Sequence, residues 1–256
     1  QTKTKNNDTI SINLDLKGMN DSLTAYLSWD NTLPTISQSG EILVNTHFES
    51  IDNRVNAHIQ FLPTQLVIQN AIWDMAASDI TTNFKEFTVN DFNLESNDQL
   101  IHIDGKASKS IDDLLAIDLH NIDLEFISGL LLRSAAIEFG GKTTGQVNLT
   151  RLFDKPIIEA DVSISDFLFN HAYWGNVHAT SNFDNINKKI NFGGVVLADN
   201  RDTTAVIDGG FYLGKDSLDL KGKAKRLDLR FLDYYLSSVL QNVRGYGSGD
   251  IHVYGN

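Results

Sequence analysis

The histidines and carboxylates are the residue types of this chain that could hold a metal ion or move a proton. There are 7 His and 33 Asp or Glu among 256 residues. His171 and His178 are the closest histidine pair, and no pair has the i, i+2 spacing of a strand or the H-E-x-x-H spacing of a helix. The sequence therefore predicts no metal site. We expect the histidines on polar strand faces: His47, His58, His102, His120, His171, His178 and His252.

Acidic clusters favour turns over binding sites. The segment 199–202 (Asp-Asn-Arg-Asp) could suggest calcium, but the D-x-D-x-D-G spacing with a distal Glu is missing. Asp104-Gly105 and Asp208-Gly209 are predicted to form hairpin turns, since these residues tolerate positive φ, and such turns predict strands joined as a meander. Asp112-Asp113 could resemble the paired acids of a glycosidase, although such pairs are common in so acidic a chain.

Other catalytic signatures are missing from the sequence. It has no Cys and no G-x-S-x-G segment. Gly193-Gly194 and Gly209-Gly210 do not stand between a strand and a helix, so they predict bulges or bends in a sheet and not a phosphate cradle. We expect no enzymatic activity and no cofactor.

Charge and hydropathy exclude several function classes. The formal net charge of −12 argues against binding to nucleic acid or to anionic headgroup surfaces. No run of about 18 apolar residues appears, and Gln1 does not open a signal peptide. We expect a chain that lacks a membrane anchor and begins inside a larger protein.

Alternation of apolar and polar residues dominates the chain. It begins where Ile10, Ile12, Leu14 and Leu16 alternate with polar residues. Period two is typical of antiparallel strands with one wet face, and the other face then forms an apolar surface. The candidate residues of that surface are Ile10, Ile12, Leu14, Leu16, Ile117, Leu119, Ile122, Leu124, Val147, Leu149, Val162, Ile164, Ile190, Phe192, Leu218, Leu220, Leu227 and Leu229.

Two segments have apolar residues at spacings of three and four. These segments, 126–135 and 231–240, predict short amphipathic helices laid against the sheet.

The same two segments belong to an internal repeat. The run 121–127 matches 226–232, 141–149 matches 245–253, and 103–105 matches 207–209, all at offsets of 104 or 105 residues. Three anchors in one order predict repeat units over about 46–150 and 151–256. Modules of this kind stack into arrays, so 1–256 is expected to be an internal segment of a longer β array.

The repeated cassette resembles the translocation and assembly module TamB, a branch of the AsmA-like superfamily, most closely its Bacteroidetes versions. The likeness lies in Leu/Ile-Asp-Leu, a short helix that starts Phe-Ile/Leu, and Gly-x-x-x-Gly-x-Val/Ile-x-Leu/Val. The tracts 63–74 and 87–105 also look like recurring segments of that group.

The resemblance implies a mainly β fold: an elongated, curled antiparallel sheet, called a β-taco, with two short helices. It also implies a periplasmic location within a protein anchored in the inner membrane, and an outer-membrane barrel partner. Phospholipid or another apolar ligand would lie along the groove between the two membranes, in support of outer-membrane biogenesis. Two alternatives stay open: a structural or adhesive cell-surface β-repeat protein with a closed core, and a carbohydrate-binding β domain.

Overall fold

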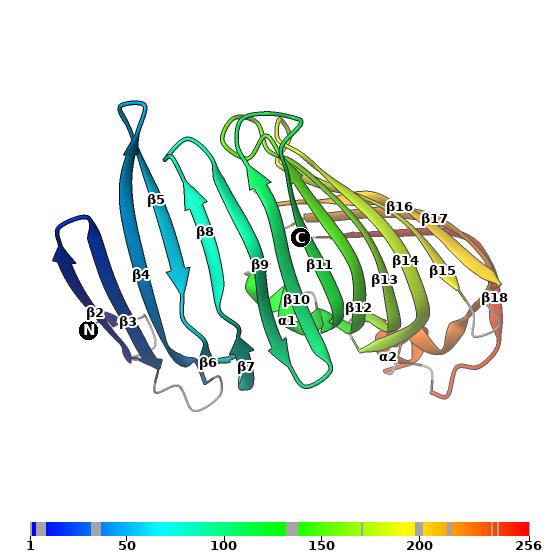
Figure 1. Cartoon of the computed structure of the whole chain (residues 1–256). Coiled ribbons are helices and arrows are strands. Elements are labelled where there is room, and N and C mark those ends of the chain that lie inside the picture. The colour runs from blue at the N-terminus through cyan, green and yellow to red at the C-terminus, as the bar shows by residue number, and fades with distance from the viewer. Residues whose placement is uncertain are drawn as a thin grey trace. The chain divides into compact units, whose positions relative to one another are not determined.

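The computed structural model describes residues 2–3, 9–31, 37–131, 138–169, 171–197, 202–213, 217–236, 238–239 and 241–255. Antiparallel strands make up most of it, with few helices (Figure 1), which confirms the predicted mainly β antiparallel fold. The chain divides into two compact units. Unit 1 comprises Gln1–Asp118 and Thr150–Asp154, and unit 2 comprises Leu119–Leu149 and Lys155–Asn256.

Unit 1 is built from strands of very different lengths, joined mostly by hairpins. They are β1 (Thr2–Lys3), β2 (Thr9–Met19), β3 (Ser22–Asn31), β4 (Ser39–Ile51), β5 (Arg54–Phe61), β6 (Thr64–Ile68), β7 (Ala71–Met75), β8 (Ser78–Thr82), β9 (Phe87–Ser96), β10 (Gln99–Ala107) and the start of β11 (Leu114–Asp123). Strand β5 pairs with β8, and the β6–β7 hairpin pairs with both β4 and β9. The expected meander is therefore interrupted once, by this hairpin.

Unit 2 contains strands together with the helices found among the described residues. Its elements are α1 (Leu124–Leu131), β12 (Phe139–Thr150), β13 (Ile157–Phe169), β14 (Ala172–Asp184), β15 (Lys189–Leu197), β16 (Thr203–Tyr212), β17 (Ser217–Asp228), η1 (Leu229–Phe231), α2 (Leu232–Leu236) and β18 (Tyr246–Gly255). From β13 to β18 each strand pairs with the next in antiparallel register, so this part is the predicted meander.

Both predicted helices exist, with shifted bounds. Helix α1 begins at Leu124, two residues before the predicted start, and 132–137 lie outside the described residues. The second helix begins as a 3₁₀ turn whose N-cap is Asp228, with its Oδ1 accepting the Arg230 backbone N–H at 2.9 Å. Helix α2 then ends at Leu236, and residues 237 and 240 lie outside the described part of the chain.

The hairpin turns use Asn and Asp, as expected, but at other positions. Asp52-Asn53 and Gln69-Asn70 join their strands with both residues at positive φ, the conformation of a type I′ turn. The predicted turns at Asp104-Gly105 and Asp208-Gly209 are wrong, because both pairs lie inside strands. Gly105 (φ +114°) stands at a register shift between β9 and β10, a bulge and not a strand end. Most of the predicted turn at 199–202 lies outside the described residues.

The bulges predicted at the two glycine pairs of unit 2 are wrong, and close strand approach occurs only at Gly209-Gly210, because a Cβ at Gly193 or Gly194 would come no nearer than 3.4 Å to another strand. Gly193-Gly194 and Gly209-Gly210 keep regular pairing, and the register shifts lie at Val196/Leu197 and Ala224/Leu227. A Cβ added at Gly209 would stand 2.1 Å from the carbonyl oxygen of Asp219 on the next strand. Glycine therefore permits a backbone approach that a side chain would prevent.

A local geometry recurs at the spacing of the sequence repeat. Asn121 and Arg226 both have positive φ, 50° and 61°. The backbone N–H of each donates to a hydroxyl on the following strand at 3.0 Å: Asn121 to Thr144 Oγ1 and Arg226 to Ser248 Oγ. The repeat units 46–150 and 151–256 remain a prediction, with bounds that differ from those of the two packing units.

Candidate functional site: an apolar cavity in unit 2

The sheet of unit 2 directs one set of apolar side chains to a single face. Strand pairing places Ile164 beside Val177, Val177 beside Val196, and Val196 beside Ala205. Because alternate residues of a strand share a face, neighbouring rows at i±2 line the same side. Two such rows are Val162–Ala179–Gly194–Ile207–Gly222–Ile251 and Ala160–Ser181–Phe192–Gly209–Leu220–Val253.

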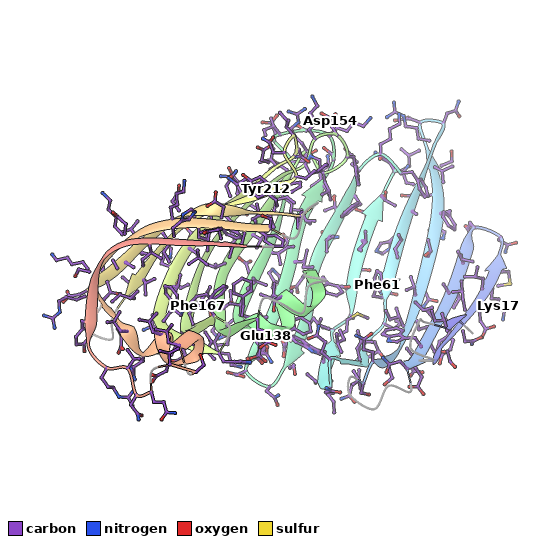
Figure 2. The ribbon with its side chains drawn as sticks, turned by 180° about the vertical axis from the view of Figure 1, so that it is seen from behind. Lys17, Phe61, Glu138, Asp154, Phe167 and Tyr212 are labelled. Atoms are coloured by element: carbon purple, nitrogen blue, oxygen red, sulfur yellow. The ribbon has the colours of Figure 1, made fainter. Side chains whose placement is uncertain are left out.

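This face surrounds a hollow of about 270 Å³. Figure 2 shows the sheet of unit 2 curled, with Phe167 on its inner side. Residues of α1 and β12 line the same hollow as residues of β18, so the face wraps round it. The lining residues are Leu124, Phe139, Val162, Ile164, Phe167, Phe169, Trp174, Val177, Ala179, Thr180, Ser181, Phe192, Gly194, Val196, Ile207, Leu218, Leu220, Ile251 and Val253.

Aromatic rings form one wall of the hollow. The Phe139 ring from β12 lies 6.2 Å from Phe167 and 5.7 Å from Phe169, measured between centroids. Phe169 meets Trp174 edge-to-face at 6.5 Å. Aromatic pairs in such arrangements stabilise packing by about 0.5–1.5 kcal/mol beyond area burial, so this wall is a fixed boundary.

Part of the predicted apolar surface lines this cavity. Leu124, Val162, Ile164, Phe192, Leu218 and Leu220 do so, and Leu227 belongs to the same buried cluster. Leu124 does so from a helix and not from a strand as predicted. Ile122 is fully buried, and the other predicted residues of unit 2 are half-buried: Leu119, Val147, Leu149, Ile190 and Leu229.

The remaining predicted residues belong to unit 1. Ile117 is half-buried in the part of β11 that unit 1 contains. Ile12, Leu14 and Leu16 on β2 are 60%, 57% and 62% exposed, so they form an open apolar stripe and enclose no cavity. Ile10 lies in β2, but its side chain is outside the described residues.

Sequence reasoning missed the residues of β14 and the aromatic wall. Along β14 the inward set is Val177, Ala179 and Ser181, whose small side chains give a weak apolar signal. Phe167 and Phe169 follow the positive-φ residue Asp166, and the bulge there shifts the register that a strict period of two requires. Ile251 and Val253 could have been found, because they occupy the repeat positions that match Val147 and Leu149.

The outer faces of the strands are polar, and histidines pair there with carboxylates. The His252 Nε2 lies 2.8 Å from Asp219 Oδ1, and this hydrogen bond is the main cause of the lowered pKa of Asp219. Four further strand histidines lie between 2.9 and 3.7 Å from a carboxylate oxygen: His47, His58, His102 and His178. His171 lies 2.7 Å from Glu138, but in the turn before β14 and not on a strand as predicted. Among the residues that the structure describes, no three His, Asp or Glu side chains come together as metal ligands.

One outer-face cluster has the residue types of a hydrolase triad. His178 Nδ1 lies 3.4 Å from Ser163 Oγ, and its Nε2 lies 3.5 Å from Asp161 Oδ1. Both distances exceed the roughly 2.6–3.2 Å that positions a nucleophile and its base. The side chains of His178 and Asp161 are also 46% and 69% exposed, so the cluster is a set of cross-strand neighbours in water.

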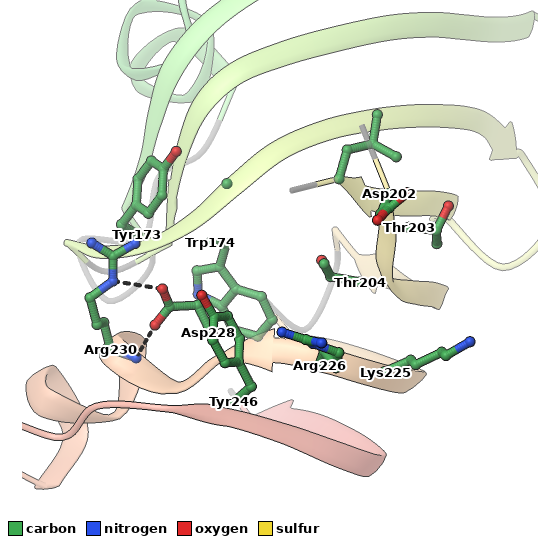
Figure 3. Close-up of a pocket in the computed structure, with 12 residues that line it drawn as sticks. Tyr173, Trp174, Asp202, Thr203, Thr204, Lys225, Arg226, Asp228, Arg230 and Tyr246 are labelled. Atoms are coloured by element: carbon green, nitrogen blue, oxygen red, sulfur yellow. Dashed lines mark hydrogen bonds and ion pairs between the residues drawn. The ribbon is translucent and has the colours of Figure 1, made fainter. Parts of the chain in front are cut away.

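A second, polar pocket of about 730 Å³ lies at one end of the same strands. Its walls carry Lys225, Arg226 and Arg230 together with Asp202 and Asp228 (Figure 3). Tyr173, Thr203, Thr204 and Tyr246 add hydroxyl groups, and the wall also includes Trp174, Gly175 and Leu197. The sequence signal for this pocket is diffuse, since its residues come from five strands and a 3₁₀ turn.

Comparison with known proteins gave no match: no protein-family model, curated protein or solved structure is similar to this chain. The helices formed by the described residues are all too short, or too polar, to cross a membrane.

Proposed function

We propose that this chain holds lipid acyl chains in the apolar cavity of unit 2, as a segment of a TamB-like envelope protein. The observation that carries the proposal is the lining of the cavity. Among its 19 lining residues only Thr180 and Ser181 bring a hydroxyl, and none is charged. Such a surface favours hydrocarbon and offers few partners to a polar ligand.

The energetics suit an acyl chain. Each buried CH₂ group stabilises binding by about 0.8 kcal/mol, so even half of a 16-carbon chain contributes on the order of 6 kcal/mol before ordering costs. A hollow of about 270 Å³ has room for part of an acyl chain, whose apolar surface would be removed from water there.

The cellular setting rests on the sequence resemblance alone. We propose a periplasmic segment that conducts phospholipid between the inner and outer membranes, within a protein anchored in the inner membrane. An outer-membrane barrel would be its partner. No catalytic step is part of this function.

The cavity favours this proposal over the two alternatives. A structural or adhesive repeat with a closed core would fill the space between its inward faces, whereas here a hollow remains. A carbohydrate ligand needs several polar partners for its hydroxyl groups, but the cavity offers only the hydroxyls of Thr180 and Ser181 and no charged side chain.

Site-specific photocross-linking tests the proposal. A benzoylphenylalanine at Phe192, on the inner face of β15, should form an adduct with phospholipid when the protein is expressed in a cell with an envelope. The same probe at Tyr212 is the matched control, because Tyr212 pairs with Lys189 on the outer face of β16. Lipid found by mass spectrometry at Phe192 and not at Tyr212 supports the proposal. Equal labelling, or no lipid adduct at either position, contradicts it.

A further inference from the structure

The polar pocket and the apolar cavity share a wall. Trp174 lines both of them. Its indole is held edge-to-face against Phe169 in the aromatic wall. The two spaces therefore meet at one side chain, with an apolar compartment on one side and a polar compartment on the other. The two spaces together match an amphiphile, a ligand with one apolar part and one polar part.

The pocket is cationic in a chain that is strongly acidic. Three cationic side chains, Lys225, Arg226 and Arg230, face two carboxylates, Asp202 and Asp228. The whole chain, by contrast, has 21 Lys or Arg against 33 Asp or Glu. The local excess of positive charge is thus opposite in sign to that of the molecule.

The cations differ in how far they are already neutralised. Arg230 Nε donates to Asp228 Oδ2 at 2.7 Å, so this pair is largely self-compensated. Among the residues that the structure describes, Lys225 and Arg226 form no ion pair. These two groups are the ones available to an incoming anion.

The guanidinium groups are held in place by aromatic rings. Arg226 lies 5.2 Å from the ring centroid of Tyr246, and Arg230 lies 5.6 Å from that of Tyr173. The positive φ of Arg226 and the hydrogen bond from its backbone N–H to Ser248 fix the start of that side chain (Figure 3 shows its position). Fixing a guanidinium lowers the ordering cost of binding, and its planar fork matches the oxygens of a phosphate.

We propose that this pocket binds the phosphate of an anionic lipid whose acyl chain enters the neighbouring cavity past Trp174. The inference rests on the proposed function, because it assigns the headgroup end of the same ligand. Lys225 and Arg226 supply the charge, and the hydroxyls of Thr203 and Tyr246 supply further donors, whereas the Thr204 hydroxyl already donates to the Val196 carbonyl oxygen at 3.1 Å. A pocket of about 730 Å³ has room for a phosphate and its substituent.

Calorimetric titration of the purified, delipidated chain tests the inference. The probes are dodecyl phosphate, dodecyl maltoside and inorganic phosphate, with both detergents below their micelle concentrations. The wild-type chain should bind dodecyl phosphate at least tenfold more tightly than dodecyl maltoside. The double variant Lys225→Gln/Arg226→Gln should lose that advantage and keep its affinity for dodecyl maltoside.

The matched control removes two charges from the same strand outside the pocket. Lys221→Gln/Lys223→Gln on β17 should bind both detergents as the wild-type chain does. If both double variants weaken dodecyl phosphate equally, the effect is general electrostatics and the inference fails. If Lys225→Gln/Arg226→Gln changes nothing, the pocket does not bind the headgroup and the inference fails.

The remaining outcomes separate the inference from the proposed function. If dodecyl maltoside binds and dodecyl phosphate shows no advantage, the inference fails while the acyl-chain proposal stands. If neither detergent binds the wild-type chain, both fail. If inorganic phosphate alone binds as tightly as dodecyl phosphate, through Lys225 and Arg226, the pocket is a site for free phosphate and the lipid assignment is overturned.

Discussion

Strand β2 of unit 1 and the strands of unit 2 carry the same alternation of apolar and polar residues but differ in the burial of the apolar face. On β2 of unit 1, Ile12 and Leu16 are 60% and 62% exposed. In unit 2, Val196 and Leu218 are 1% and 5% exposed and line the wall of a hollow. Period two therefore fixes which residues share a face, whereas curling of the sheet decides whether that face is buried.

The largest expected difference between the units concerns leucine truncation. Leu218→Ala should lower the free energy of unfolding by about 2–5 kcal/mol, because it enlarges an existing hollow in a buried cluster. Leu14→Ala in unit 1 should change it by less than about 0.5 kcal/mol, since Leu14 is 57% exposed. Urea denaturation followed by circular dichroism measures both. Equal losses would mean that the two apolar faces are equally buried in solution.

A second expected difference concerns the glycines that permit close strand approach. A Cβ at Gly222 would stand 2.4 Å from the carbonyl oxygen of Val206, while one at Gly18 on β2 would have nothing within 4 Å. Gly222→Val should destabilise unit 2 by about 1–3 kcal/mol through overpacking. Gly18→Val should be neutral or slightly stabilising, since valine suits a strand. Hydrogen exchange of the β16–β17 and β2–β3 peptides checks this, and unchanged protection of β16–β17 would show that curling does not depend on this glycine.

Filling the hollow should act on binding more than on folding. Ala179→Leu adds three carbon atoms to the inner face of β14, where Ala179 lines the cavity. Affinity for dodecyl maltoside should fall about tenfold, which corresponds to about 1.4 kcal/mol. Val206→Leu is the control, because Val206 is 50% exposed on the outer face of β16. A loss of affinity in the control of the same size would place the ligand elsewhere.

The smallest expected effect comes from the polar outer face. The hydrogen bond from His252 lowers the pKa of Asp219 below its ordinary value of 3.8, so the ionised carboxylate is favoured in the folded state. Its contribution to stability is present above the ordinary aspartate pKa and is lost as the pH falls through the lowered folded value. The melting temperature of the wild-type chain should exceed that of Asp219→Asn at pH 6, and the gap should close towards pH 3. A constant gap would contradict this account.

Alternation in the sequence predicts which residues share the inner face of the sheet, but not which residues enclose the cavity. Apolar and polar residues alternate regularly along β13 and β17, and this alternation predicts Val162, Ile164, Leu218 and Leu220 as inner-face residues. The aromatic wall was missed, since the bulge after Asp166 breaks the period of two.

The positions of the turns and the polar pocket are harder to predict from the sequence. Asp-Gly served as a bulge at Gly105 and as a close contact at Gly209, which local composition cannot distinguish from a hairpin. In the sequence, Lys225 and Arg226 are two ordinary charged residues near the end of β17. They become part of a pocket only because the strand register places Tyr246 and Thr204 beside them.

The most direct test of the account is X-ray diffraction from crystals of the chain grown with a phospholipid that carries bromine on its acyl chains. The account predicts anomalous bromine peaks in the hollow of unit 2, between Val162 on β13 and Val253 on β18. Peaks confined to the exposed stripe of Ile12, Leu14 and Leu16 on β2, or no bromine at the hollow, would contradict it.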